Sequence, residues 1–322
     1  MSTAMVFPGQ GSQAVGMGKS IADAFPAARE IFERVDAALS QKLSRLMFEG
    51  PEDELTLTAN AQPALMAVSM AALRALEIET GFRPAVDAAY VAGHSLGEYS
   101  ALCAAGSLGL EDAARLLRLR GSAMQKAVPM GEGAMAAILG LDFGKVVKIA
   151  SQAASDYYLS GAVCQAANDN GGEQVVISGT KEAVERAMEL AKLAGAKRAL
   201  PLPVSAPFHC ALMQPAALEM EAALASTAIG PPKPPLVANV TASVTEDPDF
   251  IRKSLVAQVT GTVRWRESVQ FMCVRGVTRF LEIGAGKVLS GLVKRIAEGA
   301  AAVSIGTAAD IAAYKSSPLC SI

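Results

Sequence analysis

Histidine is scarce in this sequence. The 322 residues include only two histidines, His94 and His209. Cysteine is also sparse, and the five cysteines at positions 103, 164, 210, 273 and 320 form no CxxC motif. We therefore expect no metal site and no redox cofactor, because zinc sites and dithiol pairs depend on such spacings. An odd number of dispersed cysteines is typical of the reducing cytoplasm, where we expect this protein to reside.

An excess of charge of one sign is also lacking. The 29 Lys and Arg residues nearly balance the 31 Asp and Glu residues, and neither sign forms a long run, which argues against binding of nucleic acid. The mean hydropathy is +0.31, but charged residues interrupt every apolar stretch before the ~18 residues that a membrane span needs. The N-terminus has no basic segment followed by an apolar one. We therefore expect neither a secretory signal nor a membrane partner.

Apolar residues, in contrast, are abundant. They make up 51% of the chain, enough for a large core, and the length exceeds the ~100–150 residues of a typical single domain. A helical pattern that begins with Pro63 as its first residue ends at Gly81. Such helical patterns alternate with five predicted strands, at 4–7, 87–94, 236–240, 277–283 and 302–305. This alternation predicts an α/β fold with a parallel sheet.

The middle of the chain has a different order of predicted elements. They are strand 134–140, helix 142–155, strand 162–168, strand 174–178, helix 180–194 and strand 197–204. The order βαββαβ is that of a ferredoxin-like unit. We therefore expect a large α/β-hydrolase-like domain of residues 1–130 and 203–322, with a small ferredoxin-like domain of residues 131–202 inserted into it.

The motif GHSLG at residues 93–97 is the strongest candidate for chemistry. It has the pattern GxSxG between a predicted strand and a predicted helix, which is typical of a nucleophile elbow. Glycines at both ends allow a sharp turn, and Ser95 then lies at a helix N-terminus, where free N–H groups favour negative charge. The pattern predicts Ser95 as a nucleophile.

A serine nucleophile needs a base at neutral pH, and histidine is the usual one. His94 directly precedes Ser95, so we expect its side chain to point away from the nucleophile and to pack at the end of the strand. His209 is therefore predicted as the base by elimination. Cys210 beside it is expected to be a packed thiol. The group that orients His209 stays open, since an Asp, a Glu or a backbone carbonyl could do it.

Arg120 is unusual in its position on a predicted helix over residues 111–128. At about 100° per residue it falls within the apolar stripe of that helix, whereas Arg115 and Arg118 fall on other faces and are predicted to be solvated. A buried guanidinium must find an anion. Either a structural salt bridge or a substrate carboxylate could supply it, and arginine suits a carboxylate through its bidentate geometry.

Other functions must be weighed against nucleophilic catalysis by Ser95. The loop at residues 9–14 has the form G-x-G-x-x-A, but Pro8 and the lack of an acidic residue ~20 positions later argue against dinucleotide binding. A hydrolase would share the elbow and release the acid to water, yet it would not require Arg120. An inactive scaffold that only binds a partner protein would have no use for the elbow or the base.

Nine segments together carry a family resemblance: FPGQGSQ (7–13), QPA (62–64), GHSLGE (93–98), RGSAM (120–124), GAMAA (133–137), QVVISG (174–179), AKRALPLPV (196–204), His209 and GAGKVL (284–289). With them the chain resembles, to about residue 306, the malonyl-CoA:acyl carrier protein transacylases of bacterial fatty-acid synthesis. The resemblance implies a malonyl transfer through a malonyl-serine ester in a ping-pong reaction, with malonyl-CoA and acyl carrier protein as partners. We expect no cofactor and a monomer.

The resemblance also implies a role for single residues. Ser95 would be the acylated nucleophile, His209 its base, and Arg120 the group that holds the malonyl carboxylate. The backbone N–H groups of Gln10 and Leu96 would form the oxyanion hole.

In this family a backbone carbonyl from a glutamine-bearing loop orients the histidine. Gln258 matches that glutamine in this sequence. The resemblance thus implies a Ser–His dyad without a third, acidic member.

Overall fold

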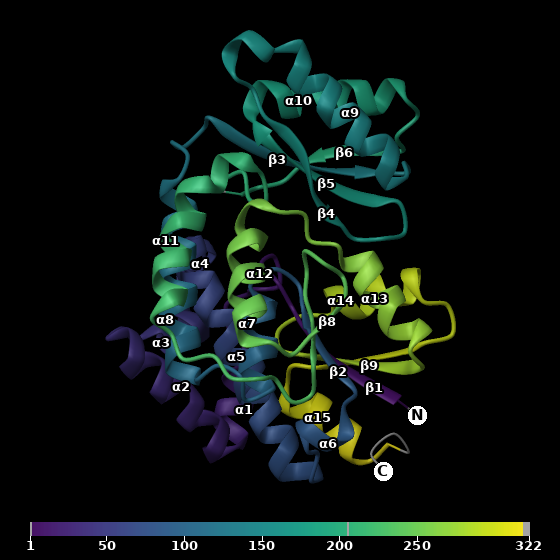
Figure 1. Ribbon diagram of the computed structural model, residues 1–322. Coiled ribbons are helices and arrows are strands. Elements are labelled where there is room, and N and C mark those ends of the chain that lie inside the picture. The colour runs from purple at the N-terminus through teal and green to yellow at the C-terminus, as the bar shows by residue number, and fades with distance from the viewer. Residues whose placement is uncertain (1, 205, 318–322) are drawn as a thin grey trace.

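The computed structural model describes residues 2–204 and 206–317, which form two separate sheets (Figure 1). The strands of the larger sheet are β1 (Ser2–Phe7), β2 (Tyr90–Gly93), β7 (Leu236–Val237), β8 (Val244–Thr245), β9 (Val277–Ile283) and β10 (Ala301–Ile305). Their order across the sheet is β10-β9-β1-β2-β7-β8, and only the β7–β8 pair is antiparallel. The predicted α/β class with a parallel sheet is confirmed.

Helices pack on both faces of the large sheet. They are α1 (Lys19–Ala24), α2 (Pro26–Leu39), α3 (Leu43–Glu49), α4 (Glu52–Thr56), α5 (Thr58–Thr80), α6 (Pro84–Asp87), α7 (Gly97–Ala104), α8 (Leu110–Lys126), α11 (Gln214–Ala225), α12 (Pro248–Thr260), α13 (Trp265–Val274), α14 (Val288–Ile296) and α15 (Ala308–Lys315). Alternate residues of β1 face opposite sides, since successive strand side chains point in opposite directions. Met5 belongs to the core cluster that contains α5 and α8, and Val6 to the cluster of α13 and α14 around Trp265.

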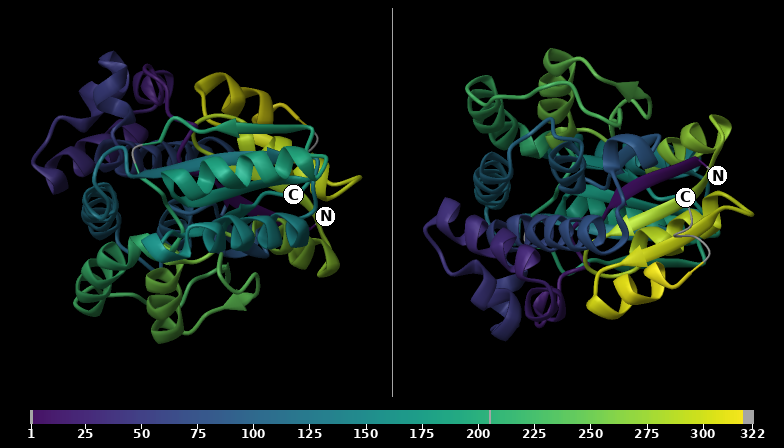
Figure 2. Two further views of the ribbon diagram at one scale, coloured as in Figure 1. Left: turned by 90° about the horizontal axis from the view of Figure 1, so that it is seen from above. Right: turned by 90° about the horizontal axis from the view of Figure 1, so that it is seen from below.

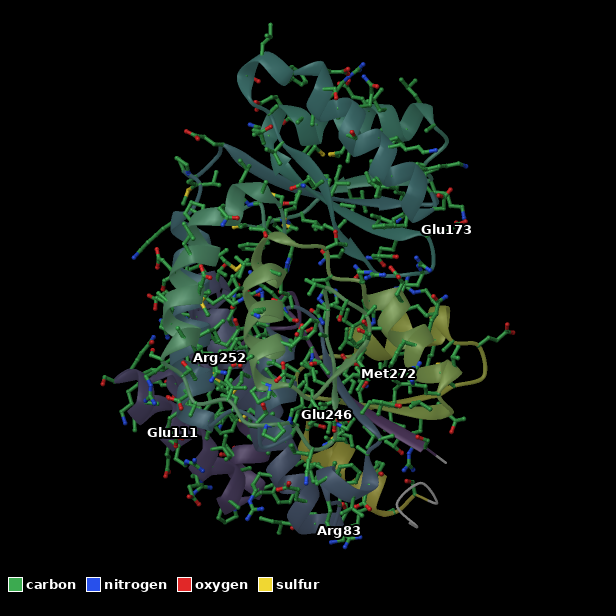
Figure 3. All side chains as sticks on the ribbon, viewed as in Figure 1. Arg83, Glu111, Glu173, Glu246, Arg252 and Met272 are labelled. Carbon is green, nitrogen blue, oxygen red and sulfur yellow. The ribbon has the colours of Figure 1, made fainter. Side chains whose placement is uncertain are left out.

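Side-chain contacts join these helices at their ends. Arg252 of α12 donates from Nε to the Leu224 carbonyl (3.2 Å) and from Nη2 to the Thr227 carbonyl (2.9 Å), so it satisfies carbonyls at the C-terminal end of α11 (Figure 3). Glu111 of α8 forms an ion pair with Arg34 of α2 (2.8 Å). None of the helices in the described residues is both long and apolar enough to cross a membrane.

The small sheet contains β3 (Gly133–Leu139), β4 (Cys164–Asp169), β5 (Gln174–Thr180) and β6 (Arg198–Pro201). It is antiparallel, with the order β4-β5-β3-β6, and α9 (Phe143–Asp156) and α10 (Lys181–Leu193) lie side by side on one face (Figure 2). This is the predicted βαββαβ unit. We propose 131–202 as the small domain and 1–130 with 203–322 as the large one, because β3 and β6 begin and end close to these limits.

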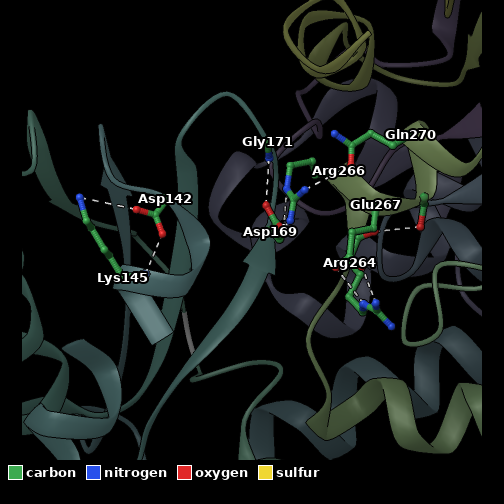
Figure 4. A network of polar contacts seen from close by, with 9 residues as sticks. Asp142, Lys145, Asp169, Gly171, Arg264, Arg266, Glu267 and Gln270 are labelled. Atoms are coloured by element: carbon green, nitrogen blue, oxygen red, sulfur yellow. Dashed lines mark hydrogen bonds and ion pairs between the residues drawn. The ribbon is translucent and has the colours of Figure 1, made fainter. Parts of the chain in front are cut away.

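The end of β4 is fixed against the large domain. The Asp169 N–H donates to the Val263 carbonyl (2.9 Å), and the Val263 N–H donates to the Ala167 carbonyl (2.8 Å). The buried Asp169 carboxylate forms an ion pair with Arg266 of α13 (2.8 Å) and also accepts from the Gly171 N–H (Figure 4). These contacts hold the β4–β5 hairpin beside the carboxyl ends of the large sheet's strands.

Two expectations about the elements were wrong, and some elements were not predicted. Pro63 is not the first residue of its helix, since α5 begins five residues earlier at Thr58. Tertiary packing holds the turn before Pro63 against α8, where a Cβ on Gly121 would lie 2.5 Å from the Thr58 carbonyl oxygen, although proline supplies no N–H to the helix. Strand 236–240 shortens to β7, and it pairs with β8, which had not been predicted. Helix α11 was also not predicted.

Candidate active site

Ser95 lies in a sharp turn between β2 and α7. Its φ of +53° is in the left-handed region, which residues other than glycine seldom adopt. A Cβ on Gly93 would lie 1.9 Å from the Gly97 backbone, and a Cβ on Gly97 would lie 2.3 Å from the Phe7 carbonyl oxygen. The turn therefore requires glycine on both sides of the serine, as the GxSxG pattern indicated.

The structure brings His209 to Ser95 from another part of the chain. The Ser95 Oγ and His209 Nε2 atoms are 2.8 Å apart, and His209 is only 4% exposed. His209 Nδ1 lies 2.8 Å from the Gln258 carbonyl oxygen. Because a carbonyl can only accept, Nδ1 carries the ring proton and Nε2 is free to accept from the serine hydroxyl. The arrangement is a Ser–His pair oriented by a backbone carbonyl.

Gln258 is not in a loop, in contrast to the expectation from the resemblance. It lies in the last turn of α12, where backbone carbonyls have no partner within the helix. Its carbonyl is therefore free to accept from His209. The Gln258 side chain is fully buried and also takes part in the site.

Arg120 points from α8 into the site and is 1% exposed. It donates from Nη1 to Gln62 Oε1 (2.9 Å), and from Nη2 to Gln258 Oε1 (2.8 Å) and to Ser95 Oγ (3.1 Å). All of these acceptors are neutral, and within the described residues Arg120 forms no ion pair and its Nε has no partner. A structural salt bridge, the alternative considered from the sequence, is therefore not found. Burial lowers the pKa of Arg120, so an anion placed beside it would be bound strongly.

The other arginines of α8 behave differently from Arg120. Arg115 is exposed and pairs with Asp112 (2.7 Å), as predicted. Arg118 was predicted to be solvated but donates from Nη1 to Asn60 Oδ1 (2.7 Å) and from Nη2 to Gln41. The expectation failed because the helix wheel did not show that the N-terminal part of α5 covers this face.

Gln10 and Leu96, which carry the two predicted oxyanion-hole N–H groups, follow the carboxyl ends of the neighbouring strands β1 and β2. Phe7 of β1 is in register with Gly93 of β2, so the loops that follow these strands lie side by side. Neither N–H has an acceptor among the described residues, and both residues line the same cavity as Ser95. These two donors are therefore available to a bound group.

The Gly9–Ala14 loop does not continue directly into a helix. The next helix, α1, begins only at Lys19. The loop thus lacks the helix N-terminus on which a dinucleotide pyrophosphate would rest, and this geometry argues against that alternative.

The cavity around Ser95 has a volume of about 560 Å³ and lies between the two domains. The large domain supplies Ser95, Arg120 and His209, and the small domain supplies Met135 and Asn168. His94 also lines this cavity, and its Nε2 is 2.9 Å from Asn170 Oδ1 in the β4–β5 hairpin. The His94 side chain is thus held by Asn170.

Several residues of the site were not predicted from the sequence as site residues. Gln62 belongs to the QPA segment of the resemblance and Asn168 to the polar end of a predicted strand, and neither position by itself indicates a role in the site. Asn239 accepts from the Ser95 N–H through Oδ1 (2.8 Å), and Glu98 is fully buried below the elbow. The signal that could have indicated Glu98 is its place directly after the GxSxG pattern, at the end of the GHSLGE segment.

The pH dependence of acylation follows from the surroundings of His209. Burial and the nearby charge of Arg120 lower the pKa of His209 to about 3, so the imidazole stays neutral and able to act as a base well below its ordinary pKa near 6.5. We expect kcat/KM for acyl transfer to stay level from pH 7.5 to about pH 5. Steady-state rates at constant ionic strength would test this, and an acidic limb with its midpoint at or above pH 6.5 would contradict it.

A Ser–His pair on an elbow of an α/β sheet, with free N–H donors and an unpaired buried arginine, defines an acyl-transferring serine protein. In agreement, residues 4–314 match the family model described as "Acyl transferase domain". The malonyl CoA-acyl carrier protein transacylase of Bacillus subtilis is 48% identical over 293 residues, which cover 91% of this chain and 90% of that protein.

Solved structures give the same result. An acyl-carrier-protein S-malonyltransferase from Bartonella henselae superimposes with a TM-score of 0.94 at 54% identity, covering 100% of both chains. A malonyl-transacylase in complex with its type II PKS acyl-carrier protein has a TM-score of 0.92 at 44% identity, covering 97% of this chain and 98% of that one. The chain belongs to the malonyl CoA-acyl carrier protein transacylases of the acyl transferase family.

Proposed function

We propose that this enzyme transfers a malonyl group from malonyl-CoA to the phosphopantetheine thiol of acyl carrier protein, through a malonyl ester of Ser95. The transfer would supply malonyl groups for the elongation of fatty-acid chains. The family assignment supports the reaction, and the residues described above support the role of each group.

One observation carries the choice of malonyl over other acyl groups. Arg120 is buried, its acceptors among the described residues are all neutral, and its Nη2 lies 3.1 Å from Ser95 Oγ. A malonyl group differs from an acetyl group by one carboxylate, which the planar guanidinium can bind through two hydrogen bonds. The substrate would therefore supply the anion that the protein does not.

In the first half-reaction, Ser95 Oγ attacks the thioester carbonyl of malonyl-CoA. His209 Nε2 takes the hydroxyl proton, and the negative charge on the carbonyl oxygen is stabilised by the N–H groups of Gln10 and Leu96. Each such donor contributes about 10²- to 10³-fold to the rate. The C–S bond then breaks, His209 returns the proton to the departing CoA sulfur, and the malonyl ester of Ser95 remains.

The second half-reaction is the reverse with a different thiol. His209 takes the proton from the phosphopantetheine thiol, and the sulfur attacks the ester carbonyl. The C–O bond to Ser95 breaks, and His209 returns the proton to Ser95 Oγ. The product is malonyl-acyl carrier protein and the free enzyme.

Incubation with malonyl-CoA should add one malonyl group to the protein, and peptide mapping by mass spectrometry should locate it on Ser95. Ser95→Ala should not be acylated. A Ser95→Ala protein that still becomes acylated and turns over would contradict the assignment. Adding acyl carrier protein should move the group to its thiol, whereas release of free malonate as the main product would favour the hydrolase alternative.

We further infer that one chain suffices and that it works in the cytoplasm. All six proposed site residues come from one chain, so the site requires no residue from a second copy, and a monomer stays our proposal. Cys103, Cys164, Cys210 and Cys273 are free thiols, which supports a reducing compartment. Cys210 is a packed thiol, as predicted, with its Sγ 3.1 Å from the Pro207 carbonyl. Cys320 lies outside the described residues.

A further inference from the structure

Glu98 is a buried acid three residues after the nucleophile Ser95. It lies in the first turn of α7 and is 0% exposed. Its Oε2 accepts from the Gln258 Nε2 (2.8 Å) and from the Asn239 N–H (3.0 Å). In the part of the chain that the structure describes, Oε1 has no partner and no cation forms an ion pair with the carboxylate. A buried acid without a cation is costly, so its retention needs a reason.

The two partners of Glu98 hold the reacting groups. Gln258 contacts three of them: its Oε1 accepts from Arg120 Nη2 (2.8 Å), its Nε2 donates to the Ser95 carbonyl (3.0 Å), and its backbone carbonyl accepts from His209 (2.8 Å). Asn239 Oδ1 accepts from the Ser95 N–H (2.8 Å), and its Nδ2 donates to the Gly93 carbonyl. Nucleophile, base and arginine are thus all tied to Gln258 and Asn239.

Glu98 helps to set which way the Gln258 amide faces, since it is the nearest (2.8 Å) of three acceptors around Nε2, with the Ser95 carbonyl (3.0 Å) and Asn239 Oδ1 (3.3 Å). In the observed orientation, Nε2 faces acceptors and Oε1 faces the Arg120 donor. In the reversed orientation, the amide NH₂ would face the guanidinium, and Oε1 would face the oxygens of Glu98 and Ser95. An acceptor at the position of Glu98 Oε2 therefore favours the amide orientation that Arg120 needs.

The amide also separates two opposite charges. If Glu98 contacted Arg120 directly, the pair would be neutralised and the guanidinium would have less affinity for a substrate carboxylate. With Gln258 between them, Arg120 is held in place by neutral acceptors and can still pair with an anion.

We propose that Glu98 is a positioning residue, which fixes the Gln258 amide and the Asn239 backbone and, through them, Ser95, His209 and Arg120. The proposal rests on the proposed function. Burial raises the pKa of Glu98 to about 7, so both protonation states are present at neutral pH. Because the proton can reside on Oε1, Oε2 accepts in both states. The site therefore requires an acceptor oxygen at the position of Oε2, and it does not require a negative charge there.

Two conservative variants of Glu98 distinguish the position of the acceptor oxygen from the charge of the side chain. Glu98→Gln keeps an acceptor at the position of Oε2 and removes the charge. Glu98→Asp keeps the charge and withdraws the acceptor by one methylene. We expect Glu98→Gln to retain kcat/KM for malonyl-CoA within about threefold, and Glu98→Asp to lose about tenfold or more, because the Asn239 N–H loses its acceptor and Gln258 Nε2 loses its shortest hydrogen bond. Ser100→Ala is the matched control, a buried change in the same helix at a hydroxyl that has no partner among the described residues.

The readouts are the rate of Ser95 acylation by intact mass, the Tm, and the ratio of kcat/KM for malonyl-CoA over acetyl-CoA. Glu98→Asp should also lower this ratio, since Arg120 depends on the orientation of Gln258; a role in folding alone would lower Tm and leave the ratio unchanged. Equal activities of the two variants, a more active Glu98→Asp, or an unchanged ratio in Glu98→Asp would overturn the proposal. A wild-type protein that acylates normally under the same conditions shows that such a result concerns Glu98 and not the proposed function.

Discussion

Replacing His209 with alanine is expected to slow acylation of Ser95 by about two to four orders of magnitude, the usual contribution of a positioned general base. The serine hydroxyl is 2.8 Å from His209 Nε2, and no other histidine contacts it in the described residues. Without the imidazole, nothing accepts the proton as the Oγ attacks. Rapid-quench mass spectrometry with malonyl-CoA would measure the acylation rate directly.

His94→Ala is the matched control, since these two are the only histidines in the chain. The His94 ring is held by Asn170 (2.9 Å) and packs near Trp265, with a distance of 5.8 Å between ring centroids. We expect its loss to affect mainly local packing, seen as a lower Tm, with acylation much less affected than in His209→Ala. Interchangeable kinetic effects of the two substitutions in folded protein would show that the base has been assigned wrongly.

Arg120→Ala should strongly lower kcat/KM for malonyl-CoA while leaving kcat/KM for acetyl-CoA unchanged or higher. Losing one partner of a buried ion pair costs ~3–5 kcal/mol, or roughly 10²- to 10³-fold or more in kcat/KM for malonyl-CoA. An acetyl group has no carboxylate, so its transfer loses no ion pair and no longer takes place beside an unpaired buried cation. The ratio of kcat/KM for malonyl-CoA over acetyl-CoA is the decisive measurement. If both values fell equally, Arg120 would be structural.

Two further variants make this test specific. Arg120→Lys should restore the ratio only in part, because an ammonium cannot reproduce the planar fork. Arg115→Ala removes an exposed arginine of the same helix, whose contact with Asp112 (2.7 Å) is a surface ion pair worth little. Arg115→Ala should therefore change kcat/KM very little for either malonyl-CoA or acetyl-CoA.

The predictions from sequence succeeded where the signal is local. The elbow pattern is visible within five residues, and Gly93 is required by a local contact, since a Cβ there would lie 1.9 Å from the Gly97 backbone. Arg120 was placed on the inner face by helical periodicity, which depends only on the spacing of apolar residues within α8. His209 followed from the scarcity of histidine, a property of composition. The βαββαβ order of the small domain was likewise visible from alternating patterns.

The partners of these residues depend on contacts that no local pattern encodes. Gln258 and Glu98 are 160 positions apart, and Asn239 and Ser95 are 144 apart, yet both pairs are within 3 Å. Pro63 inside α5 and the half-buried Arg118 were predicted wrongly for the same reason, since packing between α5 and α8 overrides the local preference of each residue.

The sequence by itself thus determined which groups can react: one serine on an elbow, one available histidine and one inward-facing arginine. Only the tertiary structure decided how they are held. It placed the Gln258 carbonyl at the end of a helix, where it is free to orient His209, and it left Arg120 surrounded by neutral acceptors. The physical reason is that reactivity depends on residue type and local backbone, whereas orientation and charge balance arise from side chains that meet only when the sheet and its helices pack together.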